Sequence, residues 1–537
     1  MTITRREFMV RSGLVAAALG TGTSLSTGTS YAAADTITLA VAARSPGGIN
    51  PQQTGLTGGD NWAINQVFNT LVEAPDGRWA SKPEDFQPSL AVSWESSADA
   101  KTWTYKLRKG VAFHKGYGEM TSDDVVFTFN RQLDPKTVTA NKVFYTNIAS
   151  VEALDPLTVR FTLKRPDPLF NGSAVATLSA SIVSRKAFEE KGDKFNMDGI
   201  GTGPYQVDSI TASGGTKLKA FPEHFAGPPA TPNLLITYIA DTTARTLAFA
   251  SGQVDMIEGV RAPGWLNTMK QRSAKTIFDA TAPGSLNTLH VNLTRPPLND
   301  LRVRQALRYA IDNAQIANAF NGIATPMVGV IAPQFAGSVK MEDLPPELQY
   351  KPDPEKAKAL LAEAGHPQGV TIPCYVSQRE DYASIMLMIQ EQLRACNINL
   401  DLKIIDHATF HSDNHLDKNS LALWSSSYPP IGTSILASQL ASDAEVKADG
   451  TGQGNYSHYG VAIPGIDALL DKAQDEPDFN KRTALIQEAE KQVLKDLPLF
   501  GIITLSYVIA RNPRLDIGYK VEAGPAYWSL SKAKLTA

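Results

Sequence analysis

The spacing of hydrophobic and polar residues changes along the chain, and the first part favours strands. Between residues 88 and 164 the residues mostly alternate with a period of two, which predicts half-buried strands at 102–108 and 157–164. The segment Thr121-Ser122-Asp123-Asp124 resembles a capping box and predicts a helix that ends before Asp134-Pro135. We therefore expect a sheet-rich α+β module in this part of the chain.

From about residue 230 the pattern alternates between strand and helix periods. The predicted strands lie at residues 234–239, 254–257, 370–376 and 398–405. The predicted helices lie between Asp241 and Gly252, after Asp300, between Asp353 and Gly365, and at residues 383–395, 466–474 and 479–494. Residues 370–405 thus form one β-α-β unit, and the alternation predicts an α/β fold.

Composition and charge indicate a globular protein of several domains. The chain has 537 residues, of which 43% are hydrophobic and 20% are charged, so two or three lobes are expected. Its 51 basic and 54 acidic residues give a net charge of −3. Because this balance provides no basic surface field, nucleic acid is not an expected partner.

The sequence lacks the motifs of several common enzyme classes. It contains no H-E-x-x-H, G-x-S-x-G, Walker-type or C-x-x-C motif, so we predict no catalytic residue, no resident metal and no cofactor. The segment Gly201-Thr202-Gly203-Pro204-Tyr205 begins like a nucleotide-binding loop, but Pro204 stands where a helix should begin. We interpret it as a tight turn that passes close to another element.

The N-terminal segment is predicted to be an export signal. Thr4-Arg5-Arg6-Glu7-Phe8-Met9 is a twin-arginine pattern, residues 14–25 are uncharged, and Ala32-Ala33-Ala34 offers a cleavage site. We therefore expect residues 1–34 to be removed as a twin-arginine signal peptide. No later apolar run is long enough to cross a bilayer, so a periplasmic protein is expected.

Two groups of residues leave alternatives open. Cys374 and Cys396 either form a disulfide in an oxidising compartment or remain two buried thiols. His407, His411 and His415 are spaced four residues apart, so on a helix they share one face. That face either presents imidazoles to a transition metal or is solvated, with its apolar neighbours turned inward.

Several segments together resemble extracellular solute-binding protein family 5, the peptide, dipeptide and nickel receptors of ABC importers. The matching segments are Pro88–Glu95, Lys101–His114, Asp123-Asp124-Val125, Gly201–Tyr205, Ser251–Asp255, Arg302–Leu307, Ala310-Ile311-Asp312 and Asp353–Gly365. They occur in the family's order over most of the chain. One departure is Asp99-Ala100, where the family often has Asp-Gly, and it should alter only a turn.

The resemblance implies an α/β periplasmic binding protein whose two lobes close on a ligand like a trap. Lobe I would comprise residues 35–61, 196–282 and 503–537, and lobe II residues 283–502. An α+β subdomain, residues 62–195, would be inserted in lobe I. The resemblance also implies a non-enzymatic receptor that delivers its ligand to an ABC permease in the inner membrane. We expect a monomer, because a single two-lobed trap suffices for delivery.

One cation and one missing anion bear on the ligand. Arg379 resembles the arginine that dipeptide-binding members use for the terminal carboxylate, and a guanidinium suits this role because it can make two charge-assisted bonds. Peptide-binding members also have an acidic residue after a tryptophan, which holds the ligand's amino group. Here Trp424 is followed by Ser425-Ser426-Ser427, so either Asp60 meets the amine or the ligand has no free amine.

The remaining candidate residues are hydroxylic or aromatic. Ser425 and Ser427 are expected to bond hydroxyls or amides, and Trp424, Tyr428 or Trp62 to stack on a planar group or a sugar. Trp424 has a second interpretation, as a core residue at a strand end. The predicted ligand is a short peptide or peptide-like solute. The alternatives are a sugar- or opine-like conjugate and a metal, whereas a hydrolase would need a nucleophile and a base that the sequence does not show.

Overall fold

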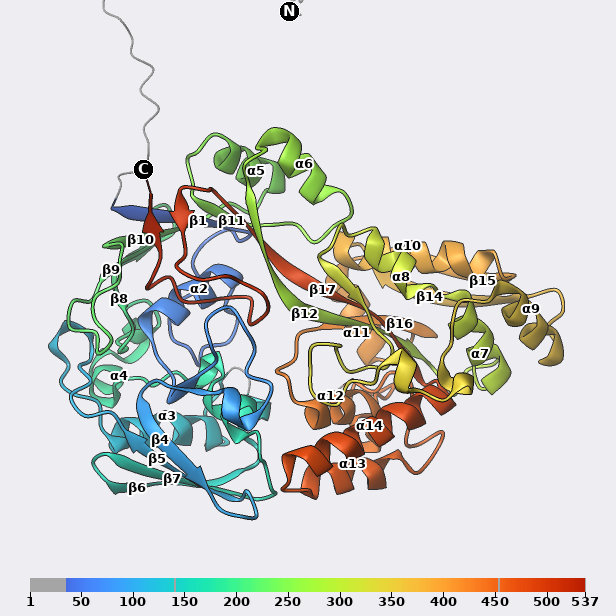
Figure 1. Cartoon of the computed structure of the whole chain (residues 1–537), viewed down its shortest axis with the longest axis horizontal. Helices are drawn as coiled ribbons and strands as arrows, with labels where there is room; N and C mark the ends of the chain where they lie inside the picture. The colour runs from blue at the N-terminus through green and yellow to red at the C-terminus, as the bar shows by residue number, and fades with distance from the viewer. Residues whose placement is uncertain (1–34, 140–141, 453, 537) are drawn as a thin grey trace, which may run out of the picture. The chain divides into compact units, whose positions relative to one another are not determined.

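The computed structural model describes residues 35–139, 142–452 and 454–536, coloured along the chain in Figure 1. The predicted signal peptide, residues 1–34, lies outside the described residues. Among the helices that are described, none is both long and apolar enough to cross a membrane.

The largest sheet in the described part of the chain has nine strands. In spatial order they are β16 (Leu421–Ser426), β12 (Ile277–Val291), β17 (Leu499–Arg511), β11 (Met256–Glu258), β1 (Thr36–Val41), β10 (Asn233–Tyr238), β9 (Gly215–Ala220) and β8 (Tyr205–Thr211), with β13 (Ala324–Pro326) paired to β17. Strand β1 is parallel to both of its neighbours, β10 and β11. The carboxyl ends of these three strands therefore lie at the same edge of the sheet.

Strands β12 and β17 run antiparallel to each other over most of their length (Figure 1). Most of their residues are buried, as expected of strands covered on both faces. The sequence of β17 is a nearly continuous apolar run, whereas β12 also buries polar residues such as Asn287 and His290. The predicted lobe boundaries at 282/283 and 502/503 fall within these two strands, and the register shifts between Thr281 and Ser285. The division into two lobes remains a prediction. In this division the paired strands β12 and β17 would connect the two lobes.

The predicted sheet-rich module contains a four-stranded antiparallel sheet. Its order is β4 (Ala91–Ser96), β5 (Thr102–Leu107), β7 (Thr158–Leu163) and β6 (Ile148–Asp155). In β5, Trp103, Tyr105 and Leu107 are buried and alternate with more exposed residues, which confirms the period-two pattern. Helix α3 (Ser122–Leu133) begins with the predicted capping box, in which Asp124 accepts a hydrogen bond from the backbone N–H of Thr121 at 3.0 Å.

The predicted β-α-β unit is confirmed. Strands β14 (Val370–Ser377) and β15 (Ile398–Ile405) are parallel, and α10 (Glu380–Arg394) connects them. The other helices are α2 (Gly58–Val67), α4 (Arg185–Lys191), α5 (Thr242–Ala250), α6 (Trp265–Arg272), α7 (Leu301–Ala310), α8 (Asn313–Asn318), α9 (Pro354–Glu363), α11 (His407–His415), α12 (Gly432–Leu440), α13 (Ile466–Asp475) and α14 (Phe479–Asp496). Short strands complete the fold: β2 (Val72–Glu73), β3 (Gln87–Pro88), β18 (Leu515–Asp516) and β19 (Lys534–Leu535).

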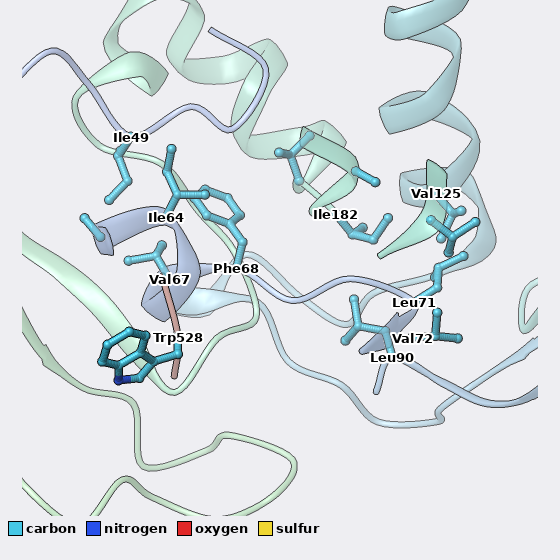
Figure 2. Packing of buried hydrophobic residues seen from close by; sticks show 14 of the residues in the cluster. Ile49, Ile64, Val67, Phe68, Leu71, Val72, Leu90, Val125, Ile182 and Trp528 are labelled. Atoms are coloured by element: carbon cyan, nitrogen blue, oxygen red, sulfur yellow. The ribbon is translucent and has the colours of Figure 1, made fainter. Parts of the chain in front are cut away.

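A large hydrophobic core joins segments that are far apart in the sequence. Figure 2 shows Ile64 and Val67 of α2 and its C-cap residue Phe68 in this core, together with Trp528 from the C-terminal segment. Leu71, close after α2, belongs to the same cluster. Because this core fixes α2, it also fixes the position of the helix start at the carboxyl end of β1.

Two local predictions have clear outcomes. A Cβ atom added at Gly201 or Gly203 would overlap the backbone carbonyl oxygens of Val67 and Gln66, which confirms that this turn passes close to another element. Cys374 and Cys396 are both free and buried, so the alternative of two buried thiols is the one observed.

Candidate functional site

Arg379 occupies the predicted position between a strand and a helix. It is the N-cap residue of α10, and its backbone N–H donates to the Ser377 hydroxyl at 3.1 Å. Its guanidinium donates to both oxygens of Asp381, from Nε at 3.0 Å and from Nη2 at 2.8 Å. The Arg379 side chain is 48% exposed, so part of the cation remains accessible to a solute.

A second arginine shares the Asp381 carboxylate. Nη2 of Arg261 lies 3.0 Å from Oδ2 of Asp381, and both side chains of this pair are largely buried. Nη1 of Arg261 donates to the Ser285 hydroxyl at 2.9 Å, and the guanidinium lies over the Tyr507 ring, 4.6 Å from its centroid. Two guanidinium groups therefore share the Asp381 carboxylate, and the exposed one, Arg379, is suited to bind an anionic group as well.

The serine segment after Trp424 lies next to this charged group. The hydroxyls of Ser427 and Tyr507 are 2.8 Å apart, and Ser427 is exposed. The Tyr382 hydroxyl donates to the backbone carbonyl of Ser425 at 3.1 Å, which anchors the end of β16. The structure thus brings the predicted residues Arg379, Ser425 and Ser427 to one polar cluster.

Trp424 is partly exposed and belongs to an aromatic group. Its ring contacts Tyr456 with a centroid distance of 5.0 Å and His411 with a distance of 5.2 Å. Tyr428 lies after β16, and burial raises the pKa of its hydroxyl, which accepts a long hydrogen bond of 3.5 Å from Ser438. The roles of Trp424 and Tyr428 as ligand contacts remain predictions.

The three histidines lie on helix α11, as their spacing predicted. Nδ1 of His407 is 2.8 Å from the Ser377 hydroxyl, and its ring packs edge-to-face on His411 with centroids 4.5 Å apart. Burial, together with the neighbouring histidines, lowers the pKa of His411 to about 4, so its ring is neutral at pH 7. In the part of the chain that the structure describes, no three histidine, cysteine or acidic side chains are placed to share a metal ion.

Asp60, the predicted amine partner, is bonded within its own surroundings. It is 1% exposed, and its oxygens accept hydrogen bonds from the backbone N–H groups of Gly47 at 2.9 Å and Thr57 at 2.7 Å and from the Thr57 hydroxyl at 2.8 Å. This arrangement caps the start of α2. A contact of Asp60 with a solute amine stays a prediction.

Trp62 lies in the hydrophobic core. It is 1% exposed and packs edge-to-face against Trp528, with ring centroids 4.8 Å apart. In this position neither face of the indole is open to a solute, so the structure gives Trp62 a packing role. Its predicted stacking role has no other observation to support it.

Sequence reasoning missed Arg261, Asp381 and Tyr507. The segment 254–257 was predicted as a strand, and Arg261 follows it at the carboxyl end, where α/β proteins bind ligands. This position was therefore a usable signal for Arg261. Asp381 and Tyr507 gave no such signal, because only the folded chain brings residues so distant in sequence to Arg261.

Comparisons with known proteins agree with this architecture. Residues 85–443 match the model of bacterial extracellular solute-binding proteins, family 5 Middle. The dipeptide-binding protein of Escherichia coli (strain K12) is 32% identical over 354 residues, which are 61% of this chain and 63%, less than two thirds, of that protein. The glutathione-binding protein GsiB of the same strain is 30% identical over 405 residues, or 74% of each chain.

Solved structures show the same fold over almost the whole chain. MoaA from A.tumefacien R10, in complex with mannopinic acid, is 31% identical, with a TM-score of 0.76 and coverage of 94% of this chain and 100% of that one. HbpA2 from Haemophilus parasuis, at 24% identity, has a TM-score of 0.77 and coverage of 94% of this chain. These matches confirm the predicted α/β fold of two-lobed periplasmic binding proteins. The chain belongs to the bacterial extracellular solute-binding proteins of family 5.

Proposed function

We propose that this protein is the receptor of an ABC importer and binds a short peptide or peptide-like acid between its two lobes. One observation carries the proposal. Arg261, from predicted lobe I, and Arg379, from predicted lobe II, share the carboxylate of Asp381. A solute that contacts both sides binds the closed arrangement better than an open one, which is the condition for ligand-driven closure.

The contacts of Arg379 favour a carboxylate ligand. Its Nε and Nη2 bond to Asp381, and among the described residues its Nη1 has no acceptor. The free edge of the guanidinium is thus available for a second carboxylate, in a charge-assisted geometry. The dipeptide- and glutathione-binding relatives support a peptide as the source of that carboxylate.

The serine segment favours a second candidate, an opine-like acid that carries hydroxyls. Ser425-Ser426-Ser427 stands where peptide-binding members have a carboxylate after the tryptophan, and Ser427 is exposed beside Tyr507. Hydroxyls at this place suit a polyhydroxylated solute better than an ammonium group. The mannopinic acid complex of MoaA, at 31% identity over 94% of this chain, supports this alternative.

Further parts of the proposal concern the cell and the partners. We propose that residues 1–34 direct export, that the protein works in the periplasm as a monomer, and that an ABC permease accepts the solute. The relatives named above are binding proteins, and we propose that this chain likewise turns over no substrate. Incubation with each bound solute, followed by mass spectrometry, tests this last point, because any converted solute would contradict it.

Thermal-shift measurements on the full chain test the proposed function. The probes are L-alanyl-L-alanine, glutathione, mannopinic acid and Ni²⁺. A solute that binds only the folded protein, and is present at a free concentration 100 times its Kd, stabilises the fold by about 2.7 kcal/mol. A true ligand therefore raises the melting temperature. We expect stabilisation by a peptide or by mannopinic acid, whereas a response to Ni²⁺ alone would overturn the proposal.

The variant Arg379→Ala tests the carboxylate contact in the same assay. We expect it to lose the stabilisation by the acidic probe. Arg394→Ala is the matched control, because Arg394 lies at the other end of α10 and is 68% exposed in a pair with Glu391. Equal responses of the two variants would contradict the role of Arg379.

A further inference from the structure

Glu258 is an acidic residue beside the charged cluster that the sequence analysis did not single out. It is the last residue of β11, at the edge where the parallel strands β1, β10 and β11 end. Its Oε2 accepts a hydrogen bond of 2.7 Å from the backbone N–H of Ala42, which directly follows β1. In open α/β sheets this edge, at the carboxyl ends of parallel strands, is where ligands bind.

The other oxygen of Glu258 points toward the start of α2. A Cβ atom added at Gly58 would lie 2.5 Å from Oε1 of Glu258 and 3.4 Å from the Tyr527 hydroxyl. A side chain at position 58 would therefore displace the carboxylate, and glycine leaves this oxygen its space. Among the described residues, Oε1 accepts no hydrogen bond, in contrast to the oxygens of Asp60.

The nearest cations do not neutralise Glu258 by direct bonds. The guanidinium of Arg245 is committed to backbone carbonyls, with bonds of 3.1 Å to Glu258 and 2.8 Å to Ile239. Arg261, three residues further on, bonds to Asp381 and Ser285. Burial raises the pKa of Glu258, because its ionised form is incompletely solvated. An approaching cation therefore stabilises this carboxylate.

The charges around Arg261 are arranged for a solute that carries both signs. Arg379 provides a partly exposed cation next to the Arg261–Asp381 pair. Glu258, the last residue of β11, provides a carboxylate three residues before Arg261, and the charge of Arg261 acts on it. The segment Ser425-Ser426-Ser427 after Trp424 offers no carboxylate. A cationic nitrogen of the solute therefore needs another acidic partner, and Asp60 is already bonded.

We propose that Glu258 binds the cationic nitrogen of the solute, while Arg379 binds its carboxylate. The shared chemistry is a protonated amine, either the terminal ammonium of a peptide or the secondary amine of an opine-like conjugate. This inference rests on the proposed function and adds to it the residue that selects for the amine.

Isothermal titration of the full chain tests the inference with L-alanyl-L-alanine, N-acetyl-L-alanyl-L-alanine and mannopinic acid. The acetylated dipeptide keeps the carboxylate but has no cation. We expect the wild type to bind at least one amine-bearing probe at least tenfold more tightly than the acetylated dipeptide. The comparison of the free dipeptide with mannopinic acid identifies the source of the amine.

Glu258→Gln keeps the size of the side chain and an oxygen for the Ala42 N–H. We expect it to weaken binding of the amine-bearing probe at least tenfold and to leave the acetylated dipeptide unaffected. Glu95→Gln is the matched control, because Glu95 is exposed in β4 and undergoes the same chemical change. Unchanged binding by Glu258→Gln would overturn the inference.

The wild-type titrations decide the inference even if Glu258→Gln does not fold, which circular dichroism will show. Equal wild-type affinities for the free and acetylated dipeptides, with no binding of mannopinic acid, would overturn the role of Glu258 and leave the proposed function intact. Binding of no probe at all would overturn the proposed function and this inference with it.

Discussion

A buried carboxylate in α14 should make the stability of the protein depend on pH. Glu490 is fully buried, and it accepts hydrogen bonds from the backbone N–H groups of Val330, at 3.0 and 3.1 Å, and Ile331, at 3.2 Å. A Cβ atom at Gly329 would overlap its Oε2. Glu490 thus holds the segment after β13 against the helix, and the perturbation we consider is Glu490→Gln.

The magnitude follows from the pKa of this carboxyl group. Burial raises the pKa of Glu490 from 4.5 to about 7, although the two amide donors oppose the change. A raised folded-state pKa means that the folded protein binds the proton more tightly than the unfolded chain. The free energy of unfolding therefore falls as pH rises through the window from 4.5 to 7, by about 3 kcal/mol in all at 1.36 kcal/mol per pKa unit.

Glutamine at position 490 removes the titration and keeps an oxygen for the two amides. Its NH₂ group needs an acceptor, so the variant is expected to lose about 1 kcal/mol at pH 5. Between pH 5 and pH 8 the difference in free energy of unfolding should shift by roughly 2–3 kcal/mol in favour of the variant. Other titrating groups, including His458 and Glu73, affect both proteins equally and cancel in this difference.

Urea denaturation of both proteins at pH 5, 6, 7 and 8, followed by circular dichroism, measures this difference. The control is Glu488→Gln, because Glu488 is exposed on the same helix and should run parallel to the wild type at every pH. If the Glu490→Gln curve also runs parallel to the wild type, the reasoning is refuted, because Glu490 would then not carry a raised pKa.

Two further predictions concern the backbone and the thiols. Gly203→Ala should lower the free energy of unfolding by roughly 2–4 kcal/mol, because the new methyl group overlaps the carbonyl oxygen of Gln66. Denaturant titration measures this loss of stability, and a loss below about 0.5 kcal/mol would count against the close approach. Cys374 and Cys396 are free and buried, and burial raises the pKa of Cys374 to about 12. In the absence of a reductant, a thiol reagent should therefore leave the folded protein unlabelled and label two thiols per chain once it is unfolded. Fewer than two labelled thiols in the unfolded chain would indicate a disulfide.

Local elements were predictable from the sequence where periodicity and caps agree. Strand β15 has the predicted bounds, 398–405, because its alternating residues lie between a helix end and Asp406, the N-cap of α11. Helix α10 begins at Glu380 and not at residue 383, because Arg379 serves as its N-cap and two acidic residues, Glu380 and Asp381, fill its first turn. These acidic residues are the start signal that the apolar period alone did not show.

The long-range pairing could not be read from the sequence. β12 and β17 are adjacent strands of one sheet, yet more than 200 residues separate partners such as Ile277 and Arg511. The candidate site depends on such pairings. Strand β17 pairs with β11, which Arg261 follows, and β12 joins β17 to β16, which Ser427 follows, so that Tyr507 of β17 lies beside both residues. Sequence reasoning could therefore name Arg379 and the serine segment but not the residues that surround them.

Asp60 shows why residue type alone is a weak guide to a site. Its sequence context, Gly58-Gly59-Asp60, fits an exposed acidic loop as well as a helix start. The structure has it as the N3 residue of a capping box, where its oxygens are already bonded. Glu258 had no such pattern around it, although its place at a strand end was predictable from the segment 254–257.

A crystal structure of the full chain grown with a saturating solute tests the central claim most directly. The solute would be L-alanyl-L-alanine or, if that does not raise the melting temperature, mannopinic acid. We predict that its carboxylate lies within 3.2 Å or so of the Arg379 guanidinium and that other solute atoms contact the segment from Glu258 to Arg261. A solute bound away from Arg379, or in contact with residues of one predicted lobe alone, would contradict the account.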